Sequence, residues 1–271
     1  MSDDTTGAFK TTYAELYDNH LVPLLFAPYA KVLSARSKML APRNILETAA
    51  GTGIVTRELA RALPRVPITA TDLNQPMIDR AETKPRMANV TWRQADAMKL
   101  PFPDASFDLI VCQFGVMFFP DKRASFRESS RVLQHGGKYI FVVWDDWKKM
   151  THAPLAIAAE VVGPMLKCDR SSLVNPPYHD EDVIRADLAA AKFHRVDIER
   201  ITRPATAASA REAAIATVHG SLIRTVIEAV DAGRLEEATD AVERGLQAKF
   251  GNGPIAGATD ALMVFAEKTL A

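Results

Sequence analysis

Strand-like and helix-like segments alternate five times within the first 145 residues, and this alternation limits the possible folds more than any other feature of the sequence. The clearest strand is the nearly unbroken apolar run at 107–114, which is typical of a parallel strand buried on both faces. Alternating strands and helices indicate a parallel sheet, and right-handed crossovers place helices on both of its faces. We therefore expect a doubly wound α/β fold. The predicted strands are 44–50, 66–72, 89–96, 107–114 and 138–144, and the predicted helices are 54–63, 76–83 and 121–133.

Outside this region the pattern is less regular. Residues 9–40 have helical spacing that prolines interrupt, and residues 207–250 are helical almost throughout. The turn at His135–Gly137 precedes the fifth strand, and Asp180 can cap a helix. Further helices are predicted at 154–166 and 180–192, and further strands at 193–202 and 260–268.

The strongest local signal is the segment ETAAGTG at 47–53, in which a strand runs into a glycine turn and then a helix. Gly51 and Gly53 would let the backbone approach a ligand closely, and the helix N-terminus offers free N–H groups to it. A tight turn alone could also require these glycines. The dinucleotide pattern would place a third glycine where this chain has Thr56.

Carboxylates follow the next two predicted strands. Asp72 lies 21 residues after Gly51 and could accept hydrogen bonds from both hydroxyls of a ribose, a spacing that suits NAD equally well. Asp96 could accept from an adenine amino group while the Ala97 N–H donates to the ring, although Asp96 could instead cap a loop. Met77 could pack on the adenine or belong to the core. Because parallel strands end at one edge, we expect these residues to meet there.

Composition and charge limit the classes of partner that the sequence favours. Lys plus Arg and Asp plus Glu both number 33, so no basic excess points to nucleic acid. Two cysteines give no disulfide framework, and no histidine or cysteine pair has metal-ligand spacing. The polar N-terminus lacks signal-peptide features, and the apolar stretch at 21–30 is too short to span a bilayer. We therefore expect a cytoplasmic protein without stable membrane insertion; a homodimer stays open.

Four segments resemble successive motifs of the class I S-adenosylmethionine-dependent methyltransferases, and they are similar to those of the ubiquinone and menaquinone biosynthesis methyltransferases. They cover most of residues 44–145, and residues 17–30 resemble the N-terminal cap segment of many members. The motifs are ETAAGTG, ATDLN, QADAMKLPFPDASFDLIVCQFGVMFFPD and RVLQHGGKYIFVVW.

The resemblance implies a single Rossmann-like domain over residues 1–271, with a seven-stranded, mostly parallel sheet whose last strand is antiparallel. Residues 1–43 would form a helical cap, 44–145 the cofactor-binding core, and 146–271 the remaining strands. Helices at about 207–250 would be an insertion that covers the substrate.

The resemblance also implies that S-adenosyl-L-methionine is the cofactor and S-adenosyl-L-homocysteine the product. Glu47 would orient the amino end of the cofactor, Asp72 would hold the ribose beside Leu73, and Gln113 would face the sulfonium. The complete set of implied cofactor-binding residues is Tyr17, Glu47, Ala49, Gly51, Gly53, Asp72, Leu73, Met77, Asp96, Ala97 and Gln113.

A general base is needed only if the acceptor must lose a proton, and the candidates are His20, Tyr29, His152 and Tyr17. Trp144 and Trp147 follow the fifth strand and could either wall an acceptor site or pack in the core. The acceptor is expected to be a small hydrophobic or aromatic molecule. Two alternatives stay open: a cofactor-binding protein of the same fold without methyl transfer, and a nicotinamide-dependent oxidoreductase.

Overall fold

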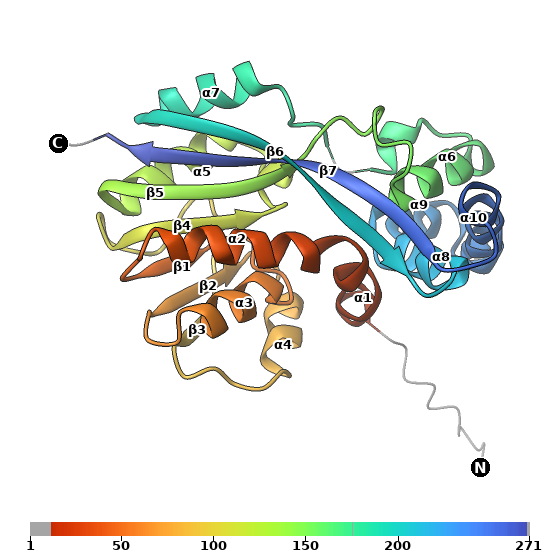
Figure 1. Ribbon diagram of the computed structural model, residues 1–271, viewed down its shortest axis with the longest axis horizontal. Helices are drawn as coiled ribbons and strands as arrows, with labels where there is room; N and C mark the ends of the chain where they lie inside the picture. Colours follow the sequence, from red (N-terminus) through yellow and green to blue (C-terminus); the bar gives the residue numbers. More distant parts are fainter. Residues whose placement is uncertain (1–11, 175, 270–271) are drawn as a thin grey trace, which may run out of the picture.

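The computed structural model describes residues 12–174 and 176–269, in which a seven-stranded sheet is flanked by helices (Figure 1). The strand order is β3-β2-β1-β4-β5-β7-β6, and β7 runs antiparallel to both of its neighbours while the other pairs are parallel. This order confirms the predicted doubly wound, Rossmann-like sheet with an antiparallel last strand. The strands are β1 (Ile45–Glu47), β2 (Ile68–Asp72), β3 (Val90–Gln94), β4 (Phe107–Gln113), β5 (Leu133–Trp144), β6 (Phe193–Ala207) and β7 (Ile255–Lys268).

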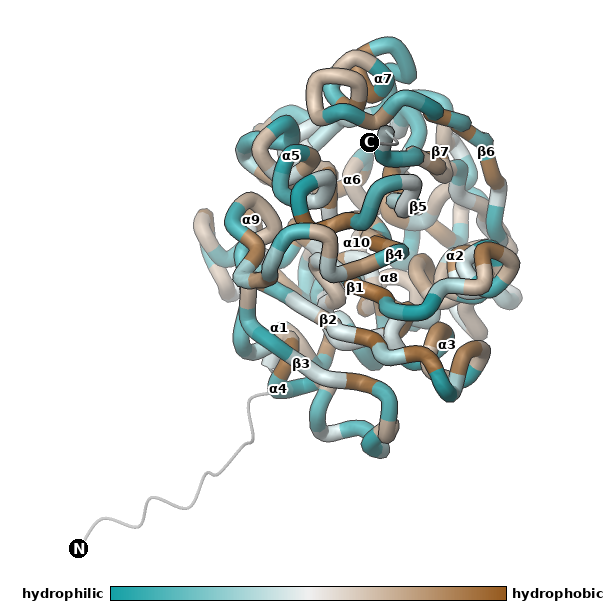
Figure 2. The backbone as a smooth tube through the Cα atoms, turned by 90° about the vertical axis from the view of Figure 1, so that its left-hand side faces the viewer, coloured by the Kyte–Doolittle hydropathy of each residue, from teal (hydrophilic) through white to brown (hydrophobic). Residues whose placement is uncertain are grey.

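Helices cover both faces of this sheet. On one face, α2 (Ala27–Met39) packs against α3 (Ile54–Ala62), beside α4 (Gln75–Glu82). On the other face, α5 (Lys122–Val132) contacts α7 (Glu181–Ala190). Figure 2 shows apolar stretches along β1 and β4, in the middle of the sheet, where helices cover both faces.

A separate group of helices lies beyond the carboxyl ends of β1, β4 and β5 (Figure 1). Three of them lie between β6 and β7 in the sequence, where the insertion was predicted, and the short N-terminal helices touch this group through η1 and α8. The group consists of α6 (Pro154–Leu166), α8 (Ala210–His219), α9 (Leu222–Asp231) and α10 (Leu235–Phe250), and the N-terminal helices are α1 (Tyr13–Leu16) and the π-helix η1 (Tyr17–Phe26).

Strands β6 and β7 are longer than the sequence predicted. The prediction ended the first at 202 and began the second at 260, but the two strands stay paired until Ala207 lies opposite Ile255. Strand β5 ends at Trp144, opposite Ala261 of β7. Beyond that point β6 and β7 continue as a two-stranded ribbon in which each strand pairs with the other alone, and the short side chains of β7 there give no apolar pattern in the sequence.

The predicted turn at His135–Gly137 is instead part of β5. Leu133 pairs with Phe107 and Lys138 pairs with Leu109, so four residues of β5 face the single residue Asp108 of β4. The extra residues are accommodated by a bulge in which Gly136 has a φ of 73°.

The N-terminal segment is divided between two roles. Pro23 lies inside η1 and Pro28 in the first turn of α2, so the prolines interrupt regular helix as predicted. Helix α2 belongs to the layer that packs on the sheet, and only α1 and η1 reach toward the helical group. Residues 1–11, on which the expectation of no signal peptide rests, lie outside the described residues.

Among the described residues, no single helix is long and apolar enough to cross a membrane. One bent pair, Ala210–His219 with Leu222–Phe250, would meet the requirement by length and composition only.

Candidate functional site

The loop after β1 is held in an unusual backbone conformation. Ala49, Gly51 and Gly53 have φ values of 52°, 56° and 81°, and the left-handed region is uncommon for alanine. The Ala50 N–H donates to the carbonyl of Thr71 at 2.9 Å, which joins the loop to β2. Gly53 then begins α3, so the loop leads directly into a helix N-terminus, as predicted.

Asp72 closes this loop from the end of β2. Its carboxylate accepts the Gly51 N–H at 2.8 Å and the Asn74 N–H at 2.8 Å, and the residue is only 7% exposed. Burial raises the pKa of Asp72 although the backbone hydrogen bonds favour its charged form. The glycine turn and the acid therefore meet at one edge of the sheet, and each carboxylate oxygen can still accept a further hydrogen bond.

Glu47 ends β1 beneath the same loop and is 2% exposed. The Thr56 hydroxyl donates to its carboxyl at 2.6 Å, and burial raises the pKa of Glu47 to about 8. Thr56 occupies the position where a dinucleotide-binding loop would carry glycine. Its hydroxyl is used to satisfy a buried acid.

The two loop glycines are required for different reasons. A Cβ on Gly51 would point toward the Tyr17 hydroxyl, 3.7 Å away, which leaves only a narrow space above the loop. A Cβ on Gly53 would lie 2.5 Å from the Trp92 ring, which comes from β3. The sequence suggested that both glycines make room for a ligand, whereas at Gly53 the close neighbour is a side chain of the protein itself.

Tyr17 lies over the loop from the first residue of η1. Its ring packs against Phe26 with centroids 5.4 Å apart, and its hydroxyl is directed at Gly51. Burial raises the pKa of Tyr17 far above its usual value, so this hydroxyl stays protonated near neutral pH. The structure thus brings Tyr17 to the predicted cofactor residues.

The predicted adenine end of the site is more open. Leu73 is 61% exposed, and Met77 borders a cavity of about 640 Å³ between α1 and α4. Asp96 accepts the Met98 N–H at 2.8 Å, so it caps a tight turn as the alternative interpretation proposed. Ala97, inside that turn, is half-buried.

Gln113, the last residue of β4, carries an unmatched acceptor. Its side-chain Nε2 donates to the carbonyl of Phe26 at 3.2 Å. Its Oε1 is buried and has no hydrogen-bond partner among the residues that the structure describes. Buried polar atoms normally have a partner, so an unmatched oxygen at the end of a strand is compatible with a ligand that donates to it.

Aromatic side chains pack beside Gln113. Phe114, at a φ of 56°, stacks on Trp144 with centroids 3.7 Å apart, and Trp147 lies 5.2 Å from Trp144. Both indole N–H groups are buried without a partner within residues 12–174 and 176–269. The two tryptophans therefore have core-like burial and also unused donors.

The candidate bases are placed very differently. The Tyr29 side chain is fully buried, and its hydroxyl donates to the carbonyl of Thr259 at 2.6 Å, so it serves to join α2 to β7. His152 is exposed, and its Nδ1 lies 3.1 Å from the Thr151 hydroxyl. His20 is half-buried on η1. None of these contacts identifies a base. In the described part of the chain, no group of three His, Cys, Asp or Glu side chains is placed to hold a metal ion.

Sequence reasoning missed Asp18, which is buried between η1 and the glycine loop. The only signal was an acid three residues before the apolar stretch at 21–30. Nothing in the sequence shows which cations would contact it, because they come from α3, from α4 and from the residue after the cap of α4.

Comparison with known proteins agrees with this geometry. Residues 46–141 match a family model described as a methyltransferase domain. This part of the chain therefore resembles a methyltransferase domain. The match covers the glycine loop, Asp72, Asp96 and Gln113.

The chain is also similar to a curated methyltransferase and to solved structures. A demethylmenaquinone methyltransferase from Deinococcus radiodurans is 34% identical over 116 residues, which are 42% of this chain and 48% of that protein. The chain thus spans about half the length of that curated relative. The YcgJ protein from Bacillus subtilis (TM-score 0.59, 20% identity) is covered over 99% of its length, by 90% of this chain. The [4+2]-cyclase SpnF (TM-score 0.59, 20% identity) is covered over 81% of its length, also by 90% of this chain. At this identity both structures show only that the fold is shared.

Proposed function

We propose that the protein transfers a methyl group from S-adenosylmethionine to a small aromatic acceptor. The observation that carries the proposal is the position of Asp72. Its buried carboxylate fixes the glycine loop through Gly51 and has capacity left for a pair of hydroxyls. A ribose supplies such a pair, and acids at this strand end commonly bind one.

The residues around Asp72 fit the rest of such a cofactor. Gln113 offers an unmatched buried oxygen at the end of β4, and Tyr17 closes the space above Gly51. When bound, the cofactor supplies a sulfonium methyl group that is already strongly electrophilic. The protein then has to align the acceptor with that methyl group and to exclude water from the site.

The aromatic acceptor is inferred from the surroundings of Gln113. Phe26, Phe114 and Trp144 form a continuous aromatic cluster, and the two unmatched indole N–H groups could donate to oxygens on a ring. The relative from Deinococcus radiodurans is named for a quinone precursor, which supports an acceptor of the hydroquinone class. The helices at 210–250 would cover this acceptor.

The cofactor is tested by calorimetric titration with S-adenosylmethionine, S-adenosylhomocysteine and NAD in parallel. We expect micromolar binding of the first two and none of NAD. Binding of NAD alone would overturn the proposal in favour of an oxidoreductase.

Asp72→Ala should weaken S-adenosylhomocysteine binding by about 2 kcal/mol, the usual contribution of hydrogen bonds to a charged group. Asp79→Ala is the matched control, because Asp79 is exposed on the neighbouring helix α4. Equal affinity in wild type and a folded Asp72→Ala variant would remove Asp72 from the site.

Methyl transfer is tested separately from binding. The protein is incubated with S-adenosylmethionine and 1,4-naphthohydroquinone, and a methylated product is sought by mass spectrometry together with released S-adenosylhomocysteine. Slower amide exchange in residues 210–250 when both ligands are present would support the covering role. Cofactor binding without turnover of any hydroquinone would favour a protein of this fold that does not methylate such acceptors.

A further inference from the structure

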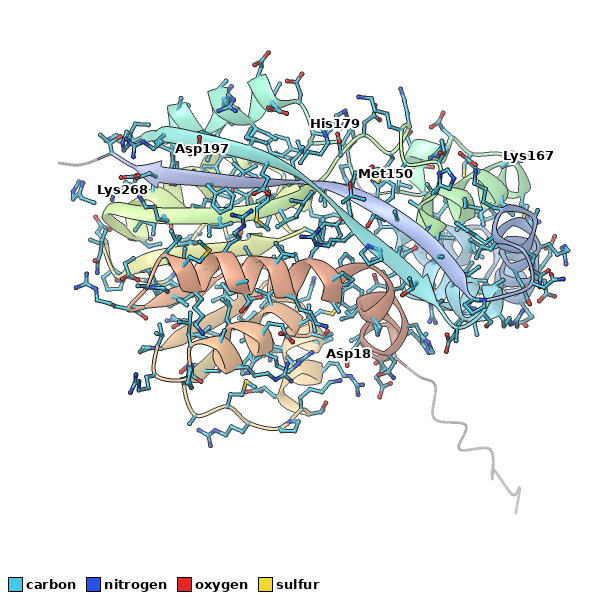
Figure 3. All side chains as sticks on the ribbon, in the orientation of Figure 1. Asp18, Met150, Lys167, His179, Asp197 and Lys268 are labelled. Carbon is cyan, nitrogen blue, oxygen red and sulfur yellow. The ribbon has the colours of Figure 1, made fainter. Side chains whose placement is uncertain are left out.

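Asp18 is a buried acid that the proposed reaction does not use. It is the second residue of η1, and its side chain is only 2% exposed. Figure 3 labels it where the N-terminal helices meet the part of the molecule that carries α3 and α4. Its neighbour in the sequence is Tyr17, whose hydroxyl is directed at Gly51.

The Asp18 carboxylate joins η1 to the glycine loop and to α4. Oδ1 accepts from the Thr52 hydroxyl at 3.0 Å, and Thr52 lies between the two loop glycines. Oδ2 accepts from Arg80 Nε of α4 at 2.8 Å and from Lys84 Nζ, two residues beyond the end of α4, at 2.6 Å. Arg57 of α3 completes the cluster at 3.9 Å.

The charges of this cluster are balanced mainly by one group. Three cations surround Asp18. Glu15 lies 3.8 Å from Arg80, and the charges of Glu47 and Glu58 also act on Arg57. Burial opposes ionisation of Asp18, but hydrogen bonds from Lys84, Arg80 and Thr52 outweigh burial and hold its pKa below the usual value. Asp18 is therefore charged near neutral pH, and its removal would take the shared counter-ion from three partly buried cations.

We propose that Asp18 is a positioning residue that fastens η1 to the glycine loop and thereby holds Tyr17 over the bound cofactor. The chain must open at this segment if a ligand is to pass between Tyr17 and Gly51, because only 3.7 Å separates the tyrosine hydroxyl from a Cβ built on Gly51. Opening would separate Asp18 from Thr52, Arg80 and Lys84 together. The cluster thus sets how long the cofactor is retained. This inference rests on the proposed function for the identity of the ligand.

The π-helical turn explains why this fastening is local. Segment Tyr17–Phe26 is a ten-residue π-helix with Pro23 inside it, and such wide turns are rare and frequent at functional sites. Pro23 lacks an N–H, so the segment has one fewer backbone hydrogen bond with which to hold its shape. Side-chain contacts such as those of Asp18 then carry more of the segment's attachment.

The test compares Asp18→Asn with Asp187→Asn. Asp187 is a suitable control because it is also a buried acid bound by an arginine, with Arg123 Nε at 2.6 Å and the Tyr178 hydroxyl at 2.9 Å. It lies on α7, on the opposite face of the sheet. Both variants replace a buried carboxylate by an amide, but only Asp18→Asn does so in the cluster that joins η1 to the glycine loop and to Arg80 and Lys84.

Two measurements are made on the full chain. Amide exchange of residues 13–26 is followed without any ligand, and the dissociation rate of S-adenosylhomocysteine is measured by stopped flow. We expect Asp18→Asn to accelerate both by about tenfold, as the loss of a charged hydrogen bond implies, and Asp187→Asn to change neither. Lys84→Met, which keeps the carboxylate and two of its cations, should accelerate both by about threefold.

The outcomes separate this inference from the proposed function. If wild type fails to bind S-adenosylhomocysteine, the proposed function fails, and exchange in residues 13–26 still tests the fastening. If wild type binds but Asp18→Asn and Asp187→Asn dissociate at the same rate, the positioning role is overturned. If Asp18→Asn does not fold, Lys84→Met decides, and its failure to loosen residues 13–26 would overturn the inference.

Discussion

Around the glycine loop, ionisable side chains are buried and joined to the backbone, whereas in residues 210–250 they form exposed pairs with one another. Glu47 and Asp72 are less than a tenth exposed, and Asp72 binds two backbone N–H groups. In the helical group, Arg211 of α8 meets Asp240 at 2.5 Å and Glu243 at 3.4 Å on α10, and also Glu236. The loop is fixed by buried hydrogen bonds that are shielded from water. The helices are held in part by exposed ion pairs, which salt can screen.

This contrast suits a site that must be rigid on one side and open on the other. Precise placement of a cofactor requires a loop that does not relax, and entry of an acceptor requires elements of lower local stability. Three substitutions test this contrast.

The largest effect is expected at Gly53. Gly53→Ala would force a Cβ to within 2.5 Å of Trp92 at a φ of 81°, which should lower the free energy of unfolding by about 3 kcal/mol. Urea denaturation measures this change. Gly253→Ala is the control, because Gly253 has open space around it and should change stability by less than about 0.5 kcal/mol. Similar losses in the two variants would show that the loop is no more constrained than a surface turn.

The second effect is a pH dependence from Glu47. Its pKa rises from 4.5 to about 8 on folding, so the folded protein keeps a proton that the unfolded chain releases. The associated stability is fully present below pH 4.5, declines as the pH rises, and is lost above about pH 8.

Glu47→Gln cannot ionise and should not show this decline. Relative to wild type, the variant should gain on the order of 2 kcal/mol in free energy of unfolding between pH 5 and about pH 6.5. Denaturation curves at several pH values provide the comparison, with Glu82→Gln as an exposed control on α4. A constant difference between wild type and Glu47→Gln across this range would mean that Glu47 ionises as readily in the folded state as in the unfolded chain.

The smallest effect is expected in the helical group. Arg211→Gln removes three ion pairs to α10, and exposed pairs contribute little each, so amide exchange in residues 235–250 should rise only about threefold. High salt should raise exchange in wild type in the same direction. Arg195→Gln, which removes an exposed pair with Glu267 on the sheet, should leave these amides unchanged. If neither Arg211→Gln nor salt changes amide exchange in residues 235–250, then apolar contacts alone stabilise these helices.

Much of the fold could be predicted because its causes are local. Apolar runs bounded by glycine and proline located the strands of the core, and a carboxylate after β2 was correctly placed beside the glycine loop. The ends of β6 and β7 could not be predicted, because there the two strands depend on each other rather than on an apolar pattern.

The sequence indicated that Glu47 and Asp72 would lie at the glycine loop, but it did not indicate Asp18 or the groups that bind it. No spacing rule connects Asp18 to Thr52, Arg80 and Lys84, since the contact depends on how η1 lies over α4. Similarly, the sequence suggested that Gly53 makes room for a ligand. The structure shows that the close neighbour of Gly53 is the Trp92 side chain. Local sequence indicates which groups are present, and tertiary packing decides which of them meet.

The position of β7 has a consequence for how the chain is made. Strand β6 has β7 as its neighbour in the sheet, and β7 also pairs with β5, although about fifty residues separate the end of β6 from the start of β7. While the chain emerges from the ribosome, β6 therefore cannot pair with the sheet until β7 has been synthesised. During that interval the edge of β5 is unpaired. Helices α8, α9 and α10 precede β7 in the sequence, so they can form before the sheet is complete.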